Sequence, residues 1–392
     1  MKNGWQMKNL GEVCDVDKCQ GIYKNLPYVG LEQIESQTGR FIGSTEPFGV
    51  KSSTFKFSPE HVLYGRLRPY LNKVMLPDFT GHCSTEIFPL KPRPGLSRKF
   101  LQYWFLREAT VEQIDATSTG ARMPRANMNA VLDFEFPLPP PPEQKRIIGI
   151  LDEAFAGIAT AKANTEKNLQ NARALFESHL QSVFTQRGPE WVEKPFYELC
   201  DIKHGFTFKS EFFTDSGDYV LLTPGNFYES GGYRDRGEKQ KYYIGKIPDG
   251  FILSEGDMLV AMTEQAAGLL GSPILVPESD RFLHNQRLGL VAKKPGVPWT
   301  NEFFFHVFNT QTVRKEIHDS ASGVKVRHTS PTKIGEVIVA FPTDVSEQKR
   351  IVSNLAALSE ETERLESICE QKLAALEALK KSLLHQAFTG QL

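Results

Sequence analysis

The chain has 392 residues, 40% hydrophobic and 24% charged, which is typical of a soluble protein with two or three domains. A net charge of −1 excludes a uniformly basic protein that coats nucleic acid, and no apolar run approaches the ~18 residues that cross a bilayer. The start of the chain lacks the apolar core of a signal peptide, and five cysteines fit a reducing compartment better than a disulfide framework. We therefore expect a cytoplasmic protein without membrane contact, in which any DNA contact comes from local basic clusters.

Residues 1–142 predict a body of mixed helix and strand. Its short β-like runs are bounded by glycine and proline, and an aromatic-rich stretch predicts a buried helix. In chain order we expect strands at 28–31, 62–64 and 86–90, a helix at 100–105, a polar glycine loop at 118–122 and a strand at 134–137. Five prolines between Pro137 and Pro142 then form a stiff spacer.

Residues 143–187 predict one long helix, from Glu143 to Thr185. Apolar or small residues recur there at alternating spacings of four and three, the narrow stripe of a coiled-coil seam. A proline followed by an acidic residue, Pro142 and Glu143, favours a helix start at this point.

Residues 188–346 predict a second body that repeats the first. Four residues between Trp5 and Asp15 return unchanged between Trp191 and Asp201, and a fifth, Leu10, returns as Phe196, all at an offset of 186 (191 − 5). The matching segments are strands at 219–222, 257–262 and 288–291, a helix at 303–308, a glycine loop at 322–325 and a strand at 337–342. The order of elements is therefore the same in both bodies.

Residues 347–392 predict a second long helix that copies the first. The pentapeptide Glu-Gln-Lys-Arg-Ile at 143–147 returns at 347–351, and 43 residues repeat without a gap at an offset of 204 (347 − 143), with fourteen identities. An internal repeat of this length indicates that the chain is two copies of one unit.

The two helices can bury their apolar stripes against each other only if the second runs back along the first. The sequence therefore predicts an α+β fold in which two mixed α/β bodies are joined by an antiparallel coiled coil of about 64 Å, with internal pseudo-twofold symmetry. The seam positions that we expect to be buried are Ile147, Leu151, Ile158, Leu169, Leu180, Ile351, Leu355, Leu365, Leu376 and Leu383.

The sequence contains no recognisable catalytic or cofactor motif. Phosphate-binding, dinucleotide-binding, zinc-protease and nucleophile-elbow patterns are all missing. Glu143 with Lys145, and Glu347 with Lys349, resemble the end of a nuclease signature, but they lie in first helical turns, where acidic residues favour the helix dipole. We expect no catalysis, no metal and no cofactor in this chain.

Two matched bodies at a fixed separation suit a ligand with two sites, and duplex DNA is the obvious candidate. Loop residues with suitable hydrogen-bonding groups could read base edges or hold phosphates. In the first body these candidates are Arg66, Arg68, Asn72, Lys73, Ser118, Thr119, Arg122 and Arg125. In the second body they are Thr263, Gln265, Asn285, Gln286, Arg287, Ser322, Lys325, Arg327 and His328.

Over nearly its whole length the chain resembles the specificity subunits of type I restriction-modification systems. The resemblance is carried by the helix starts at 140–147 and 346–351, the Phe-Thr-Gly-Gln-Leu ending at 388–392, and the order body, helix, body, helix. It implies that the bodies are target recognition domains for a bipartite double-stranded DNA site, and that the helices set the gap between its halves. His61 stands where the second body has Asp257, and such domains vary freely, so no base specificity can be transferred.

The resemblance also implies the partners. Two methyltransferase subunits would bind S-adenosylmethionine and methylate an adenine in each half-site, and two motor-nuclease restriction subunits would use ATP and Mg²⁺. The exposed helix faces, including Lys145, Arg146, Lys349 and Arg350, are where we expect the methyltransferases to dock.

Two alternatives remain open at this level. The chain could be a coiled-coil scaffold that presents two protein-binding domains, which predicts no salt-dependent affinity for DNA. It could also be a nuclease or methyltransferase with an unrecognised site, which predicts that the purified chain alone modifies or cleaves DNA.

Overall fold

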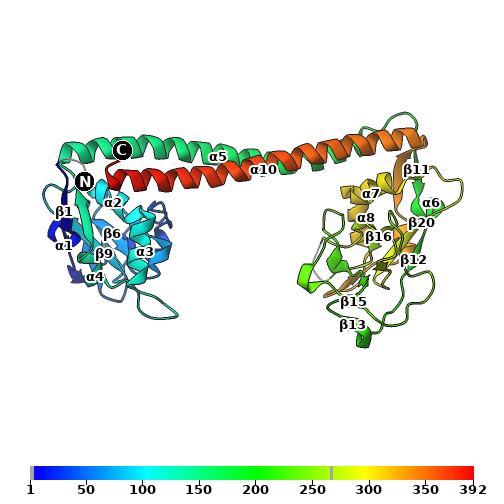
Figure 1. Cartoon of the computed structure of the whole chain (residues 1–392), viewed down its shortest axis with the longest axis horizontal. Coiled ribbons are helices and arrows are strands. Elements are labelled where there is room, and N and C mark those ends of the chain that lie inside the picture. The colour runs from blue at the N-terminus through cyan, green and yellow to red at the C-terminus, as the bar shows by residue number, and fades with distance from the viewer. Residues whose placement is uncertain (1–3, 265–267) are drawn as a thin grey trace. The chain divides into compact units, whose positions relative to one another are not determined.

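The computed structural model describes residues 4–264 and 268–392 and confirms the α+β class expected from the sequence. The chain forms two compact units, one of Met1–Asn168 with Cys369–Leu392 and one of Leu169–Ile368. Each unit holds one body together with parts of both long helices (Figure 1). The four segments expected from the sequence, 1–142, 143–187, 188–346 and 347–392, divide the chain at the helix ends instead.

The first body contains two four-stranded sheets and a two-stranded ribbon. The sheet with the longer strands, called the larger sheet, has the order β2 (Cys14–Val16), β9 (Ile87–Pro92), β6 (Val62–Gly65), β7 (Val74–Met75). It is antiparallel throughout. The smaller sheet has the order β3 (Gln20–Gly21), β5 (Thr54–Phe57), β8 (Gly81–Cys83), β4 (Tyr28–Val29), and the ribbon pairs β1 (Gln6–Asn9) with β10 (Glu135–Leu138). The helices are α1 (Leu10–Val13), α2 (Arg98–Leu106), α3 (Glu108–Ala116) and α4 (Met128–Leu132), with 3₁₀ turns η1 (Leu31–Gln33) and η2 (Pro69–Leu71).

The second body repeats this plan. Its larger sheet has the order β12 (Cys200–His204), β20 (Leu288–Lys293), β16 (Met258–Ala261), β18 (Pro273–Leu275), and its smaller sheet β13 (Phe213–Thr214), β15 (Tyr242–Tyr243), β14 (Tyr219–Leu221), β19 (Phe282–Leu283). Two ribbons pair β11 (Trp191–Pro195) with β22 (Ile338–Pro342), and β17 (Thr263–Glu264) with β21 (Arg327–His328). The helices are α6 (Phe196–Leu199), α7 (Asn301–Asn309), α8 (Gln311–Ser320) and α9 (Pro331–Gly335), with 3₁₀ turns η3 (Ser210–Phe212), η4 (Pro224–Asn226) and η5 (Gly237–Lys239).

The smaller sheets differ in one respect. Both contain a parallel pair, β4 with β8 and β14 with β19. In the first body the next strand, β5, joins this pair beside β8, whereas in the second body β15 joins beside β14. Shorter contacts complete the pattern on the other side, because the Phe48 N–H donates to the Leu26 carbonyl in the first body and Ile252 bridges Leu283 in the second, so the two smaller sheets share one plan and differ in which flanking segment forms a regular strand.

The long helices α5 (Pro141–Thr185) and α10 (Val345–Thr389) run antiparallel within each unit. In the first unit Arg146 donates to the Leu392 carbonyl at 2.6 Å and Lys162 pairs with Glu377 at 3.0 Å, so residue numbers rise along α5 as they fall along α10.

In the second unit Arg173 pairs with Glu366 at 3.0 Å, and Leu180 shares a core with Ile351 and Leu355. All ten expected seam positions are buried or half-buried, whereas Leu175 and Leu379, identical in the two copies, are 46% and 47% exposed.

A buried glutamine anchors each long helix to its own body. The Gln144 side chain accepts from the Ser97 N–H at 2.8 Å and donates to the carbonyls of Gly95 and Pro139 at 2.8 and 2.9 Å. Gln348, the second residue of the repeated pentapeptide in the other copy, makes the same set of bonds, accepting from Thr300 and donating to two prolyl carbonyls. The repeated glutamine is therefore an attachment point between helix and body.

Aromatic side chains join the bodies to the helices. The Phe100 ring of α2 lies 4.8 Å from the ring of Phe388, and the Tyr103 ring lies 5.5 Å from that of Phe155. In the second unit Phe303 of α7 packs 5.5 Å from Phe184. Within the described part of the chain, none of the helices has the length and apolarity that a bilayer crossing requires.

Candidate nucleic-acid interface

In the first body the structure brings the two candidate loops together. The loop after β6 and the loop after α3 are joined by hydrogen bonds from the Arg68 N–H to the Pro124 carbonyl at 2.7 Å and from the Ala126 N–H to the Arg66 carbonyl at 2.9 Å. The second loop, which projects beyond α3 (Figure 1), is closed at its base by reciprocal bonds between Thr119 and Arg125 at 3.1 and 3.0 Å. Residues that are 56 to 60 positions apart in the sequence (124 − 68 and 126 − 66) thus form one surface.

A single carboxylate orders two of the candidate arginines. Glu86 accepts from Arg66 Nε at 3.0 Å and from Arg125 Nε at 2.9 Å, and the Arg66 guanidinium lies 5.2 Å from the centre of the Phe88 ring. Because both bonds use Nε, each guanidinium is oriented; the terminal N–H groups of Arg66 stay available for a ligand, whereas Arg125 also donates from Nη1 to the Met123 carbonyl at 3.3 Å and keeps Nη2 available. Glu86 is not among the residues expected from the sequence, because its role depends on partners from two distant loops.

Two further arginines of this surface are exposed. In the part of the chain that the structure describes, Arg68 and Arg122 have no ion-pair partner. Arg68 has a positive φ of 51°, a conformation uncommon for a residue with a side chain.

The remaining first-body candidates serve the loops themselves. Asn72 is 1% exposed and donates to the Phe105 carbonyl at 3.2 Å, so it supports the loop and cannot read a base from this position. Lys73 is half-buried and donates to the Leu31 carbonyl at 2.6 Å, and the Ser118 hydroxyl oxygen is buried. In this structure the polar groups of these three residues are turned into the body or buried, whereas Thr119 is exposed.

The second body forms an equivalent surface. Thr263 pairs with His328 across the β17–β21 ribbon, Ser322 and His328 exchange backbone bonds at 3.0 and 2.8 Å, and the Met262 N–H donates to the Arg287 carbonyl at 3.0 Å. Thr263, Arg287 and His328 line a recess of about 620 Å³. Gln265 lies outside the described residues.

Two cations in the wall of this recess were not among the candidates. Arg236 and Lys241 line the same volume as Arg287, together with the carboxylates of Glu229 and Glu264. For Arg236 the sequence offers a signal, a charged run flanked by glycines at 232–237, which marks a polar turn; Lys241 lies four residues beyond this run.

The other second-body candidates divide into free and engaged side chains. Lys325 is exposed and, among the described residues, without an ion pair. Arg327 is held by His318, to whose carbonyl it donates at 2.6 Å. Asn285 caps the Arg287 N–H at 3.1 Å, and Gln286 is exposed but accepts from the Thr207 hydroxyl.

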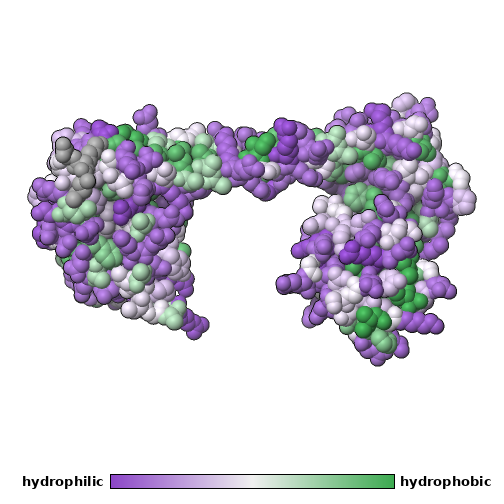
Figure 2. Space-filling model, viewed as in Figure 1, coloured by the Kyte–Doolittle hydropathy of each residue, from purple (hydrophilic) through white to green (hydrophobic). Residues whose placement is uncertain are grey.

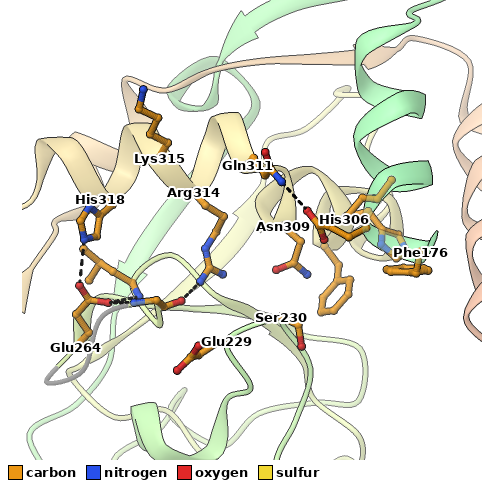
Figure 3. A pocket seen from close by; sticks show the side chains of 15 residues that line it. Phe176, Glu229, Ser230, Glu264, His306, Asn309, Gln311, Arg314, Lys315 and His318 are labelled. Atoms are coloured by element: carbon orange, nitrogen blue, oxygen red, sulfur yellow. Dashed lines mark hydrogen bonds and ion pairs between the residues drawn. The ribbon is translucent and has the colours of Figure 1, made fainter. Parts of the chain in front are cut away.

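A second cavity, of about 510 Å³, adjoins the recess and is shown in Figure 3. Glu264 is 3% exposed there, and its Oε2 accepts the backbone N–H groups of Gly268, Leu269 and Leu270 at 3.0–3.1 Å. Arg314 donates to the Gly268 carbonyl, and burial lowers the pKa of its guanidinium to about 10, so it stays charged at neutral pH. These buried groups fix the backbone next to β17.

The chain matches a family described as "Type I restriction modification DNA specificity domain" in two regions, 2–171 and 189–377. It belongs to this family. The two matched regions begin 187 residues apart (189 − 2), close to the offset of 186 between the entry segments of the internal repeat.

Relatives in this specificity family include the specificity subunit of the type I restriction enzyme EcoDI from Escherichia coli, 28% identical over 189 residues, 47% of this chain and 41% of that protein. The EcoBI specificity subunit from the same species is 25% identical over 236 residues, 60% of this chain and 44% of that protein. The chain thus spans less than half the length of these two relatives.

Two solved structures share the fold over its full length. A chain from a study of the "complex assembly" and "conformational transition of the type I R-M system" superposes with a TM-score of 0.81 at 19% identity, covering 100% of this chain and 99% of that one. The HsdS subunit from Thermoanaerobacter tengcongensis gives 0.68 at 18% identity, covering 100% and 98%.

The two specificity repeats place different groups at the same backbone position. Glu86 and Arg287 are equivalent, because their carbonyls accept from Arg66 and Met262 respectively, the first residues after β6 and β16. A carboxylate in one surface is thus replaced by a guanidinium in the other. His61 and Asp257, by contrast, do the same work, since each accepts from the N–H of a serine three residues earlier, at 3.0 and 2.8 Å. The sequence difference at that position leaves the turn unchanged.

Proposed function

We propose that this chain is the DNA sequence-specificity subunit of a type I restriction-modification complex, and that each body reads one half of a bipartite target. The observation that carries the proposal is the pair of matched loops. Each is closed by reciprocal backbone bonds, and each presents, at the same register, an exposed cation that has no ion pair with any residue of 4–264 and 268–392, Arg122 in one loop and Lys325 in the other (325 − 122 = 203). A rigid loop with a free cation suits a phosphate or a base edge.

The chemistry around the loops supports readout of base edges. An arginine whose Nε is held by Glu86 keeps a planar fork, which matches the O6 and N7 acceptors of guanine. In the second body three cations, Arg236, Lys241 and Arg287, line one recess and outnumber its two carboxylates, which suits the phosphate backbone. Because Glu86 is replaced by Arg287, we expect the two half-sites to differ.

We also propose that the long helices set the gap between the half-sites and dock two methyltransferase subunits. In this scheme 1–142 and 188–346 are target recognition domains, and 143–187 and 347–392 are the helices. Two copies of one partner need two similar docking surfaces, and the helices repeat Lys145 with Arg146 as Lys349 with Arg350. Each helix also carries one exposed leucine at an equivalent position, Leu175 in one and Leu379 in the other.

The chemistry of the complex belongs to its partners in this proposal. The methyltransferase subunits would bind S-adenosylmethionine and methylate adenine N6, and two restriction subunits would supply ATP- and Mg²⁺-dependent translocation and cleavage. This chain would supply the target sequence and hold no cofactor.

Mapping of methylated adenines tests the proposal. The chain is co-expressed with a type I methyltransferase subunit from the same operon, and the host DNA is sequenced for N6-methyladenine. We expect methylation in one bipartite sequence, lost when Arg122 and Lys325 are both replaced by alanine. Lys293→Ala is the matched control, because this exposed lysine lies at the far end of β20, ~20 Å along the strand from Arg287.

Binding to the mapped target distinguishes reading from scaffolding. Each lost phosphate contact should lower the slope of log affinity against log salt by about 0.9. A complex that methylates no defined sequence, or in which the double variant matches Lys293→Ala, would overturn the proposal in favour of a protein-binding scaffold. Methylation or cleavage by the purified chain alone would instead make it an enzyme.

A further inference from the structure

One apolar side chain stands at the tip of the second-body loop. Val324 is 99% exposed, whereas the next most exposed large apolar side chain among the described residues, Ile244, is 69% exposed. Figure 2 shows other apolar side chains at the surface of the second unit, near β13 and β15. An exposed apolar residue is unremarkable alone, but Val324 lies within the loop that carries the free cation.

The backbone holds Val324 in this position. The loop is closed by the bonds between Ser322 and His328, and Gly323 has a φ of +100°. A Cβ at Gly323 would lie 2.1 Å from the Val326 carbonyl oxygen, so only glycine fits the turn that leads into Val324. The valine is therefore presented by a defined turn.

The loop around Val324 carries positive charge and borders the recess. Lys325 follows it directly, and Val326 and His328 line the recess that also contains Arg287. Of the groups that B-DNA displays in its major groove, only the C5 methyl of thymine is apolar. Valine is also too short and too stiff at χ1 to act as a wedge between base steps, a role that longer side chains fill.

We propose that Val324 is a specificity-determining residue that contacts the C5 methyl group of a thymine in the half-site read by the second body. The inference rests on the proposed function. Lys325 would hold an adjacent phosphate, and the loop would place the valine methyls against the base edge. In the first body the equivalent position is Ala121 (324 − 121 = 203), which offers a single methyl group.

Deoxyuridine scanning tests this contact, because deoxyuridine lacks the methyl group alone. Duplexes that carry the methylation-mapped target are made with each thymine replaced in turn, and their affinity for the complex with the methyltransferase subunit is measured. For the wild type we expect one position in the second half-site to weaken binding about fivefold, the size expected for one buried methyl group. With Val324→Ala the same replacement should change affinity less than twofold.

Two variants complete the design. Val324→Thr keeps one methyl group and should retain part of the sensitivity, and Ile244→Ala removes an exposed apolar side chain outside the loop and should behave as the wild type. If each deoxyuridine replacement changed the affinity of the wild type and of Val324→Ala equally, or if the second half-site contained no thymine, the inference would be overturned. Either result would leave the proposed function intact. Failure of the wild-type complex to bind any defined target would overturn the proposed function itself.

Discussion

The attachment of α10 to the second body gives a quantitative prediction. Replacing Gln348 by alanine removes the partner of the Thr300 N–H and of the carbonyls of Pro298 and Pro342, which lie 2.8–3.1 Å from the side chain. The side chain is 0% exposed, so water does not replace these bonds without rearrangement. At about 1 kcal/mol for each hydrogen bond, we expect the free energy of unfolding of the second unit to fall by roughly 3 kcal/mol.

This loss should be visible by calorimetry. For a unit of this size each kcal/mol lowers the melting temperature by about 2–4 °C, so we expect a decrease of roughly 6–12 °C in the transition of the second unit. Hydrogen exchange of the first turns of α10 should also accelerate, because that end of the helix loses its attachment.

Lys349→Ala is the matched control, because Lys349 is the next residue of the same turn and is exposed. Gln144→Ala should produce the same effect in the first unit. If Gln348→Ala unfolds within 0.5 kcal/mol of Lys349→Ala, the buried amide does not anchor the helix and the explanation of the repeated pentapeptide is wrong.

Three further predictions concern single positions. Gly323→Ala should weaken binding to the second half-site roughly tenfold, because a positive φ and a Cβ 2.1 Å from the Val326 carbonyl strain the loop. Gly250→Ala is the control, because Gly250 is also at positive φ but has open space around it. Equal affinities for the two variants would contradict the prediction. Burial lowers the pKa of His306 from 6.5 to about 4, because the neutral imidazole is favoured in the folded protein. The free energy of unfolding should therefore be unaffected by this group above pH 6.5 and should fall by roughly 3 kcal/mol as the pH decreases towards 4. Urea unfolding at pH 7.5 and 4.5 should show a smaller decrease in the free energy of unfolding for His306→Phe than for the wild type. An equal decrease in both proteins would contradict the prediction. Glu86→Gln should relax sequence preference in the first half-site alone, since it loosens Arg66 and Arg125 together; methylation mapping would show this, and a change in the second half-site would contradict it.

The repeat, the order of elements and the long helices could be predicted because their signals are local. Alternating spacings of four and three mark α5 and α10, and the strands expected at 62–64 and 257–262 end within one residue of β6 and β16. The sequence also indicates that the loops of Arg66 and Arg125 act together, because the second body repeats both polar clusters in the same order.

What the sequence could not show depends on tertiary partners. A glutamine in a helical first turn reads as solvated, and only the bodies reveal that Gln144 and Gln348 are buried. Asn72 has a side chain suited to adenine, yet the backbone turns it inward to Phe105. Strands of two residues, such as β13 and β15, have no measurable periodicity, so their sheet partners are set by contacts far along the chain.

The edge at which β15 joins the smaller sheet determines which charges surround the recess of the second body. Because β15 lies beside β14, the Leu221 N–H donates to the Lys241 carbonyl at 2.9 Å, and the segment from Arg236 to Lys241 becomes a wall of the recess. In the first body the same edge of the parallel pair is covered by a different segment, in which the Phe48 N–H donates to the Leu26 carbonyl at 3.1 Å. A duplicated gene can thus obtain a new chemical surface by changing the side chains of one covering segment, while the larger sheet and both helix attachments stay as they were inherited.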